Sequence, residues 1–390
     1  METDYLTILN APSSEQRLTN LKNIISNEKV KPPVYNEYAN NHIHTEYSFS
    51  PYSPSAAVYF ARQAGLPTAG IMDHDSIAGA REFIEAGKIA GVATTIGLEC
   101  RVSLAGTPLE GKRVNNPDQI SCAYMALHGV PHHNIDYLND FFAPLREKRN
   151  IRNKKMVNNI NSIVSQSGIN VDFEKDVVPL SNYKIGGSVT ERHILYALAL
   201  KISEKFSDKT VEFLENDLSV PLSEKQINQM KDIGSKFFTY DLLGILKGAF
   251  IKKIYVDADE ELLHISELSD LAKKIDALLC YAYLGDVTDS VTGDKIAQKF
   301  EDDYLEELFK VLKEQNVDAV TYMPSRNTPQ QLNNVMALCK KYGFFEISGE
   351  DINSPRQSFI CKQLVKPEFS HLINATWTLI ERENKLSSDY

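Results

Sequence analysis

The sequence of 390 residues has few cysteines, a deficit of positive charge and no long apolar run. Its five cysteines are widely scattered without a C-x-x-C pair, which argues against a disulfide framework and against a zinc–thiolate site. No apolar run approaches the ~20 residues that a membrane-spanning helix needs. The first residues lack the basic start and apolar core of a signal peptide. These absences predict a reduced, cytoplasmic protein that does not enter a membrane.

The charge balance is acidic, with a formal net charge of −10. Long nucleic acids generally bind to a basic face, so this balance argues against them as partners. Basic residues do gather at 146–155, which includes Arg146, Arg149 and Arg152. Most such runs are solvated helix faces, and we expect the same here. The composition still allows a small basic pocket for one phosphate group.

Two familiar catalytic motifs are also missing. The sequence contains no G-x-S-x-G nucleophile motif and no Walker-type phosphate loop. A hydrolase that works through such a nucleophile, or an enzyme built on a P-loop, therefore has no support.

Strands and helices alternate at short intervals near both ends of the chain. We expect strands at 41–45, 68–72 and 93–102, separated by helices from 54 to 65 and from 77 to 90. This alternation is typical of a parallel α/β fold. It returns late in the chain, with strands expected at 275–284, 319–323 and 344–348 and helices at 299–315 and 329–342.

The middle of the chain breaks the alternation. From about residue 108 to 274, long helical stretches dominate, including 139–168, 191–206 and 223–237. We therefore predict one α/β domain that is interrupted by a helical insertion. The expected units are an N-terminal helical extension (1–36), the α/β domain (37–138 and 275–365), the insertion (139–274) and a C-terminal helix or tail (366–390).

Polar residues follow the expected strands, at the edge where parallel α/β folds build their sites. His42 and His44 alternate on one strand, so both side chains point to one face, as two ligands of a divalent metal would. His74 lies within Asp73-His74-Asp75, and three ionisable residues in a row are costly to crowd unless a cation balances them. Alternatively, Asp75 caps the next helix, which leaves His74 without a role.

Three further polar residues end or follow apolar runs. Glu99 lies near the end of an apolar strand, where a lone carboxylate is usually paired with a base or a metal. His128 follows a second apolar run, and a satisfied core histidine is the alternative interpretation there. Asp351 follows the last expected strand.

Together these segments resemble the PHP (polymerase and histidinol phosphatase) family. The family's first motifs are matched in order and spacing by 42–48 (HIHTEYS), 69–80 (AGIMDHDSIAGA) and 96–99 (IGLE). Residues 349–353 (GEDIN) resemble its terminal motif, Gly-Ser-Asp-x-His. Residues 189–194 (VTERHI) resemble the Arg-x-His stretch of members that hydrolyse nucleotides or short RNA.

The resemblance implies a distorted seven-stranded α/β barrel that carries up to three divalent ions, usually zinc, manganese or iron. It assigns three sets of ligands: His42, His44, Glu99 and Asp351 to the first metal, Glu99 and His128 to the second, and His74 to the third. The sequence departs from the family at three positions that often hold ligands, namely Ser50, Tyr283 and Asn353. The number of ions, from one to three, therefore stays open.

The implied activity is metal-dependent hydrolysis of a phosphoester by a metal-activated water. The substrate would be a small phosphorylated metabolite, a nucleotide or an oligonucleotide end. Arg192 and Arg326 are candidates to hold phosphate, with surface salt bridges as the alternative. His193 is a candidate general acid or phosphate ligand, and Asp73 a candidate to orient a ligating histidine. The rival hypothesis is a degenerate PHP protein that binds metal or a phospholigand without turnover.

Overall fold

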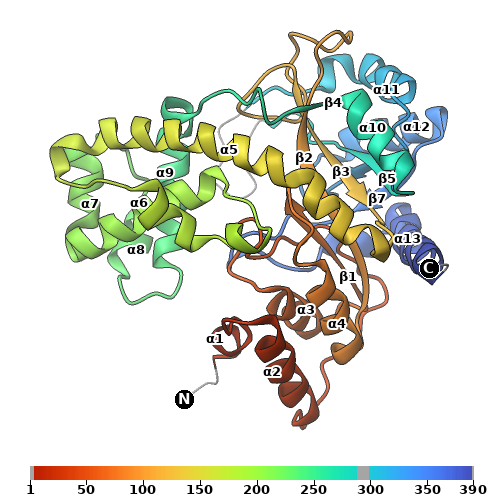
Figure 1. Ribbon diagram of the computed structural model, residues 1–390, viewed down its shortest axis with the longest axis horizontal. Helices are drawn as coiled ribbons and strands as arrows, with labels where there is room; N and C mark the ends of the chain where they lie inside the picture. Colours follow the sequence, from red (N-terminus) through yellow and green to blue (C-terminus); the bar gives the residue numbers. More distant parts are fainter. Residues whose placement is uncertain (1–3, 288–297, 389–390) are drawn as a thin grey trace.

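The computed structural model describes residues 4–287 and 298–388, which form a seven-stranded mixed sheet surrounded by helices (Figure 1). The strands are β1 (Thr68–His74), β2 (Ala93–Ser103), β3 (Cys122–His128), β4 (Leu263–His264), β5 (Leu278–Ala282), β6 (Ala319–Tyr322) and β7 (Phe345–Ser348). Their order is β1-β2-β3-β5-β6-β7, with β4 paired to β2. Most pairs are parallel, but β3 runs antiparallel to both β2 and β5.

The sheet curls so far that one short segment bridges its two edges. Ile43 pairs in parallel with Ile71 of β1 and with Ile352, which follows β7. The amide of His44 donates to the carbonyl of Ile352 at 2.9 Å. The strand predicted in this segment is thus reduced to a bridge on each side, which holds His42 and His44 between the first and last strands. The predicted fold class, an α/β fold with a barrel-like sheet, is confirmed.

Helices pack around the sheet, among them α3 (Pro54–Gln63), α4 (Ala80–Ala90), α10 (Ile265–Lys274), α11 (Leu305–Glu314) and α12 (Pro329–Tyr342). Local sequence sets their ends. The hydroxyl of Ser53 accepts from the amide of Ala56, and Pro54 occupies the first helical position of α3. Gly91 ends α4 in the left-handed conformation that favours glycine.

The insertion forms a separate helical layer on one side of the sheet (Figure 1). It contains α5 (Ile135–Val164), α6 (Glu191–Phe206), α7 (Thr210–Glu212), α8 (Glu224–Lys231) and α9 (Phe238–Ile254). These helices enclose an apolar core of their own, which includes Ile160, Leu198 and Leu246. The helix predicted at 223–237 is shorter than expected, because turns separate α8 from α9.

Both ends of the described chain pack against the α/β domain. The described part of the N-terminal extension is helical, as predicted, and contains α1 (Tyr5–Leu9) and α2 (Ser14–Ser26). They lie beside α3 and α4 (Figure 1), with Leu9 and Leu21 completely buried. The C-terminal helix α13 (Ser370–Ser388) packs on β2 and β7. Among the described helices, none has the length and apolar character required to cross a membrane.

Candidate metal centre

A single carboxylate oxygen, Oε1 of Glu99, faces three imidazole rings. It lies 3.6 Å from Nε2 of His42 and 3.4 Å from Nε2 of His44. Its distance to Nδ1 of His74 is 3.0 Å. On the other side, Nε2 of His44 lies 3.2 Å from Oδ1 of Asp351. Five of the predicted ligands therefore meet at one place.

Strand register explains this convergence. His74 at the end of β1 is the direct partner of Glu99 on β2. Asp351 precedes Ile352, whose pairing with Ile43 brings the end of β7 next to the two alternating histidines. Side chains that follow neighbouring strand ends therefore point into a common space, as in other α/β folds.

The donor atoms form two overlapping clusters. His42, His44 and Asp351 make one, and His44, His74 and Glu99 make the other, with the chosen atoms of each cluster within 4.8 Å of one another. In the part of the chain that the structure describes, these are the groups of His, Cys, Asp and Glu able to hold an ion. Imidazole nitrogens with carboxylate oxygens suit zinc, iron and manganese.

The two carboxyl groups are ionised by their surroundings. Burial alone would raise the pKa of Glu99, but the facing imidazoles of His74 and His42 hold it well below its usual range. Burial likewise opposes ionisation of Asp351, and the hydrogen bond from His44 keeps its pKa well below normal. Two carboxylates surrounded by imidazoles can be neutralised by protons on the rings or by a divalent cation, and the cation leaves the imidazoles as neutral ligands.

His128 ends β3 beside this centre. It is 1% exposed, and its Nε2 atom has no hydrogen-bond partner among the described residues. Burial, together with the nearby His42, lowers its pKa to about 3, so the ring is neutral. A neutral, buried ring nitrogen without a partner is costly, and a metal ion would satisfy it. This unpartnered atom and the two clusters fit the predicted divalent ions.

Asp73 supports the centre from behind. Its carboxylate accepts from the amide and the hydroxyl of Thr45 (2.7 and 2.6 Å) and from the hydroxyl of Ser48 (2.6 Å). The Ser48 oxygen in turn lies 3.2 Å from Nδ1 of His44. This chain of hydrogen bonds can fix the His44 ring so that its Nε2 faces the cluster, which is how outer residues commonly orient a ligating histidine.

The three departures from the family pattern have different surroundings. Tyr283 donates its hydroxyl to Asp302 at 2.6 Å and belongs to neither cluster. Asn353 donates to Oδ1 of Asp351 at 2.6 Å, while its own amide oxygen is buried without a partner. Ser50 accepts a 3.4 Å bond from the amide of Tyr52. Of the three, Asn353 directly contacts a candidate ligand.

The two arginines predicted to hold phosphate differ in position. Arg192 lies in the first turn of α6, and its charge helps to lower the pKa of Asp351. It forms no hydrogen bond or ion pair with the residues that the structure describes, so the surface salt bridge considered as the alternative does not occur there. Arg326 donates through Nε to the carbonyl of Leu284 at 3.1 Å. Its proposed contact with phosphate stays a prediction.

His193 is buried at the start of α6. Its Nδ1 accepts from the amide of Thr190 at 2.9 Å, and its ring lies edge-on to Phe49 with the centroids 5.0 Å apart. Burial and the charge of Arg149 lower its pKa to about 3. At neutral pH the ring is therefore uncharged, with its hydrogen on Nε2. This form suits a hydrogen bond to an anion better than proton donation to a leaving group.

Replacing His193 with glutamine tests this protonation state. Glutamine at the third helical position can still accept the Thr190 amide, as in a capping box, but it does not titrate. The unfolded histidine titrates near 6.5 and the folded one near 3, so its stabilising effect is complete above 6.5 and is lost as pH falls through this window. As pH is lowered, we expect the free energy of unfolding to fall more steeply for the wild type than for His193→Gln. The difference between the two slopes should be up to about 1.4 kcal/mol per pH unit. Urea unfolding from pH 7 to 4.5 measures the difference, and equal slopes would contradict it.

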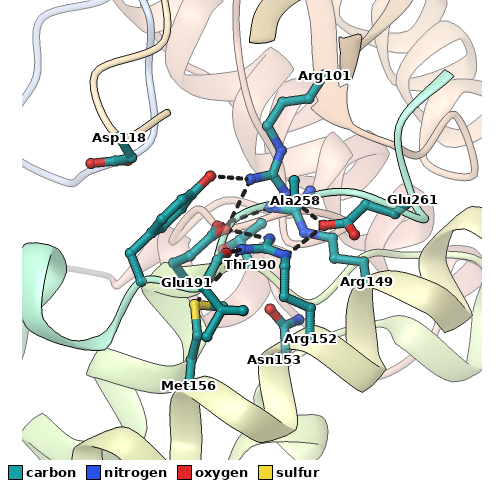
Figure 2. Close-up of polar contacts among 12 residues, drawn as sticks. Arg101, Asp118, Arg149, Arg152, Asn153, Met156, Thr190, Glu191, Ala258 and Glu261 are labelled. Atoms are coloured by element: carbon teal, nitrogen blue, oxygen red, sulfur yellow. Dashed lines mark hydrogen bonds and ion pairs between the residues drawn. The ribbon is translucent and has the colours of Figure 1, made fainter. Parts of the chain in front are cut away.

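A buried charged network that the sequence did not predict lies beside the centre (Figure 2). Arg101, Arg149 and Arg152 converge on Glu191 and Glu261, and none of the three arginine side chains is more than 4% exposed. The expectation that the basic run at 146–155 is a solvated face is therefore wrong for its arginines. Their spacing of three residues, which places them on one face of α5, was the available signal.

This network joins the insertion to the sheet. Arg101 belongs to β2, two residues after Glu99, whereas Arg149 belongs to α5 and Glu191 to α6. Arg149 also forms an ion pair with Asp75, so Asp75 is held by the insertion and does not cap α4, which begins at Ala80 with Gly79 before it. The interface between the insertion and the sheet thus lies next to two candidate ligands, Glu99 and His74.

Comparisons with known proteins agree with this geometry. Residues 40–203 match the model of the PHP domain family, a range that includes the candidate ligands up to His128 and part of the insertion. A similar crystal structure is that of a protein from Bifidobacterium adolescentis described as a metal-dependent phosphoesterase. It is 18% identical, with a TM-score of 0.54 over 86% of this chain and 95% of that one. An amidohydrolase from Chromobacterium violaceum, solved with sulfate and no metal, is 13% identical, with a TM-score of 0.54 over 86% and 96%.

The search among curated proteins gives no significant match. At these low sequence identities, the similarity to the two structures establishes the fold alone. The family match identifies the segment that carries most of the candidate ligands. Residues 40–203 therefore carry a PHP domain, and this match supports a hydrolase.

Proposed function

We propose that this hydrolase cleaves phosphoesters with a water molecule activated by divalent metal. The observation that supports this most directly is the Glu99 oxygen that faces three imidazoles, with Asp351 on the far side of His44. When bound, a divalent ion lowers the pKa of its water from 15.7 towards ~7 and so supplies a nucleophile at neutral pH. Zinc, manganese and iron are the candidates, at one to three ions per chain.

The chain's own residues would hold the ions and bind the phosphate. His42, His44, Glu99 and Asp351 would hold one ion, and the acidic oxygens leave the imidazoles free to act as neutral ligands. His74 and the unpartnered Nε2 of His128 would extend the centre. These donors belong to paired segments of one sheet, so the fold fixes their spacing before any ion binds.

Two groups at the start of α6 are suited to an anionic substrate. Arg192 has no ion-pair partner among the described residues and acts on Asp351 through its charge, so it can offset charge on a phosphate. His193 would donate a hydrogen bond from Nε2, because its Nδ1 is held by Thr190. Asp73 would keep His44 oriented through Ser48.

The net charge of the chain supports the proposed substrate class. A net charge of −10 opposes binding along a long nucleic acid, whereas a single phosphate needs only a small positive site. We therefore propose a small phosphorylated metabolite, a nucleotide or an oligonucleotide end. The sulfate in the Chromobacterium violaceum structure, a tetrahedral anion similar to phosphate, is consistent with this choice.

A degenerate centre that binds metal or a phospholigand without turnover is the second candidate. Tyr283 favours it, because its hydroxyl is bound to Asp302 and it stands where the family often has a metal-binding histidine. Turnover of a phosphoester by metal-loaded protein would exclude it.

Metal content of protein purified without chelator tests the proposal. We expect at least one tightly held ion per wild-type chain by mass spectrometry and its loss in His44→Ala, since His44 belongs to both clusters. His371→Ala is the matched control, because His371 lies outside both clusters and pairs with Glu346. Loaded wild-type protein should then hydrolyse p-nitrophenyl phosphate or its bis-ester. A wild type without metal after reconstitution with manganese, zinc or iron would contradict the hydrolase mechanism.

A further inference from the structure

The loop at 45–53, which directly follows the ligand His44, is held by the N-terminal extension. The side-chain amide of Asn10, between α1 and α2, donates to the carbonyl of Pro51 at 2.8 Å and accepts from the amide of Ser53 at 2.9 Å. The hydroxyl of Ser53 also donates to the carbonyl of Leu9 at 2.6 Å. Asn10 therefore pairs with the loop backbone much as a neighbouring strand would.

A buried arginine holds the other arm of the same loop. Arg17 on α2 is 4% exposed, and its Nη1 lies 3.1 Å from Oε1 of Glu46, two residues after His44. Its Nε and Nη2 donate to Glu82 of α4 at 2.9 and 2.6 Å. Because Glu82 fixes the guanidinium on the α/β domain, Arg17 can hold Glu46 at a defined position.

The loop also contacts the insertion. The carbonyl of Tyr47 accepts from the amide of Ser188 at 2.7 Å. Phe49 is 6% exposed and belongs to the apolar core of the insertion, where it packs against His193. The extension, the ligands and the insertion thus all meet at one loop of nine residues.

We propose that the N-terminal extension is a positioning element of the metal centre. Asn10 and Arg17 hold the loop 45–53, and this loop fixes the ring of His44 through Ser48 and the insertion through Phe49. The inference rests on the proposed function of His44 as a ligand. It concerns residues that lie outside the segment matched by the family model, which begins at residue 40.

Two mild substitutions test whether the extension holds the loop 45–53, and neither removes the buried Arg17. Asn10→Ala deletes both bonds to the loop backbone, and Glu46→Gln weakens the contact with Arg17 while keeping the side-chain shape. Arg62→Gln is the matched control. It breaks the 2.7 Å ion pair that ties Glu28 of the same extension to α3, and among the described residues Arg62 forms no hydrogen bond or ion pair with the loop 45–53.

We expect hydrogen exchange of metal-free protein to be at least about tenfold faster in peptides covering 45–53 for Asn10→Ala and Glu46→Gln, and unchanged for Arg62→Gln. With Co²⁺ as the probe, the two loop variants should bind about tenfold more weakly, which is ~1.4 kcal/mol, and show an altered absorption spectrum. A merely structural role would lower the melting temperature of all three variants and leave the Co²⁺ spectrum as in the wild type.

The two readouts separate failure of this inference from failure of the proposed function. If the loop 45–53 exchanged hydrogen at the wild-type rate in both variants, the positioning role would be overturned, whether or not the variants bind Co²⁺ normally. If the wild type binds no Co²⁺, the metal mechanism fails, and the exchange comparison alone then decides whether the extension holds the loop.

Discussion

Replacing Glu99 with glutamine is expected to remove tightly bound metal and to lower kcat/KM for a phosphoester on the order of 10³-fold, which is ~4 kcal/mol of transition-state stabilisation. The Oε1 atom of Glu99 faces His42, His44 and His74 together. Glutamine has the same shape but no charge, so it cannot balance a divalent ion among neutral imidazoles. Metal content and steady-state kinetics on the same preparations measure both effects.

Glu85→Gln provides the matched control for this substitution. Glu85 forms an exposed ion pair with Lys88 at 2.6 Å on α4, so its loss should change neither metal content nor activity. Circular dichroism would establish that both variants are folded. If Glu99→Gln held metal and turned over substrate like the wild type, Glu99 could not be the shared ligand of the centre.

The convergence of the candidate ligands is the part of the site geometry that the sequence predicted. His74 ends β1 and pairs directly with Glu99 on β2, and Ile43 beside His44 pairs with Ile71 of β1, so these three candidates had to converge once those segments were paired. The start of α6 was also predictable, because Thr190 precedes a run of apolar residues at helical spacing. The predicted and observed bounds of that helix are the same.

Strand direction was less predictable. Nothing in the apolar run of β3 distinguishes a parallel strand from an antiparallel one, and the sequence led us to expect helices from residue 108 onwards. The segment that contains Ile43 is a related case. It forms a bridge on each side in place of a full strand, because its pairing depends on how far the sheet curls, which local sequence does not encode.

The arginine network was hidden for a different reason. A basic run on a helix is usually solvated, and only tertiary partners reverse that expectation. For Arg149 and Arg152 these partners are Glu191 and Glu261, which lie far along the chain. The spacing of the arginines indicated a shared face, but the partners that make burial possible belong to a different helix and loop.

Replacing Glu191 with alanine is expected to destabilise the protein by about 3–5 kcal/mol, the usual cost of removing one partner from a buried ion pair. Glu191 lies 3.3 Å from Arg101, 2.9 Å from Arg149 and 2.6 Å from Arg152. Its loss leaves these three buried guanidinium groups with two carboxylates, those of Glu261 and Asp75. Burial would raise the pKa of Glu191, yet the arginines hold it well below its usual range. Its stabilising effect is therefore complete above pH ~4.5 and is lost as pH falls below that value.

Urea unfolding at pH 7 measures this cost, and Glu174→Ala is the matched control. Glu174 pairs with Lys154 at 2.8 Å, but both side chains are more than half exposed, so its loss should cost under about 1 kcal/mol. In Glu191→Ala, hydrogen exchange should rise first in α5 and α6, because the network is what joins these helices to β2. Adding Arg152→Met should recover part of the lost stability, since it leaves Arg101 with Glu261 and Arg149 with Asp75 and so removes the excess positive charge. A cost for Glu191→Ala no larger than that for Glu174→Ala would mean that packing of the insertion core, and not the ion network, holds the insertion against the metal centre.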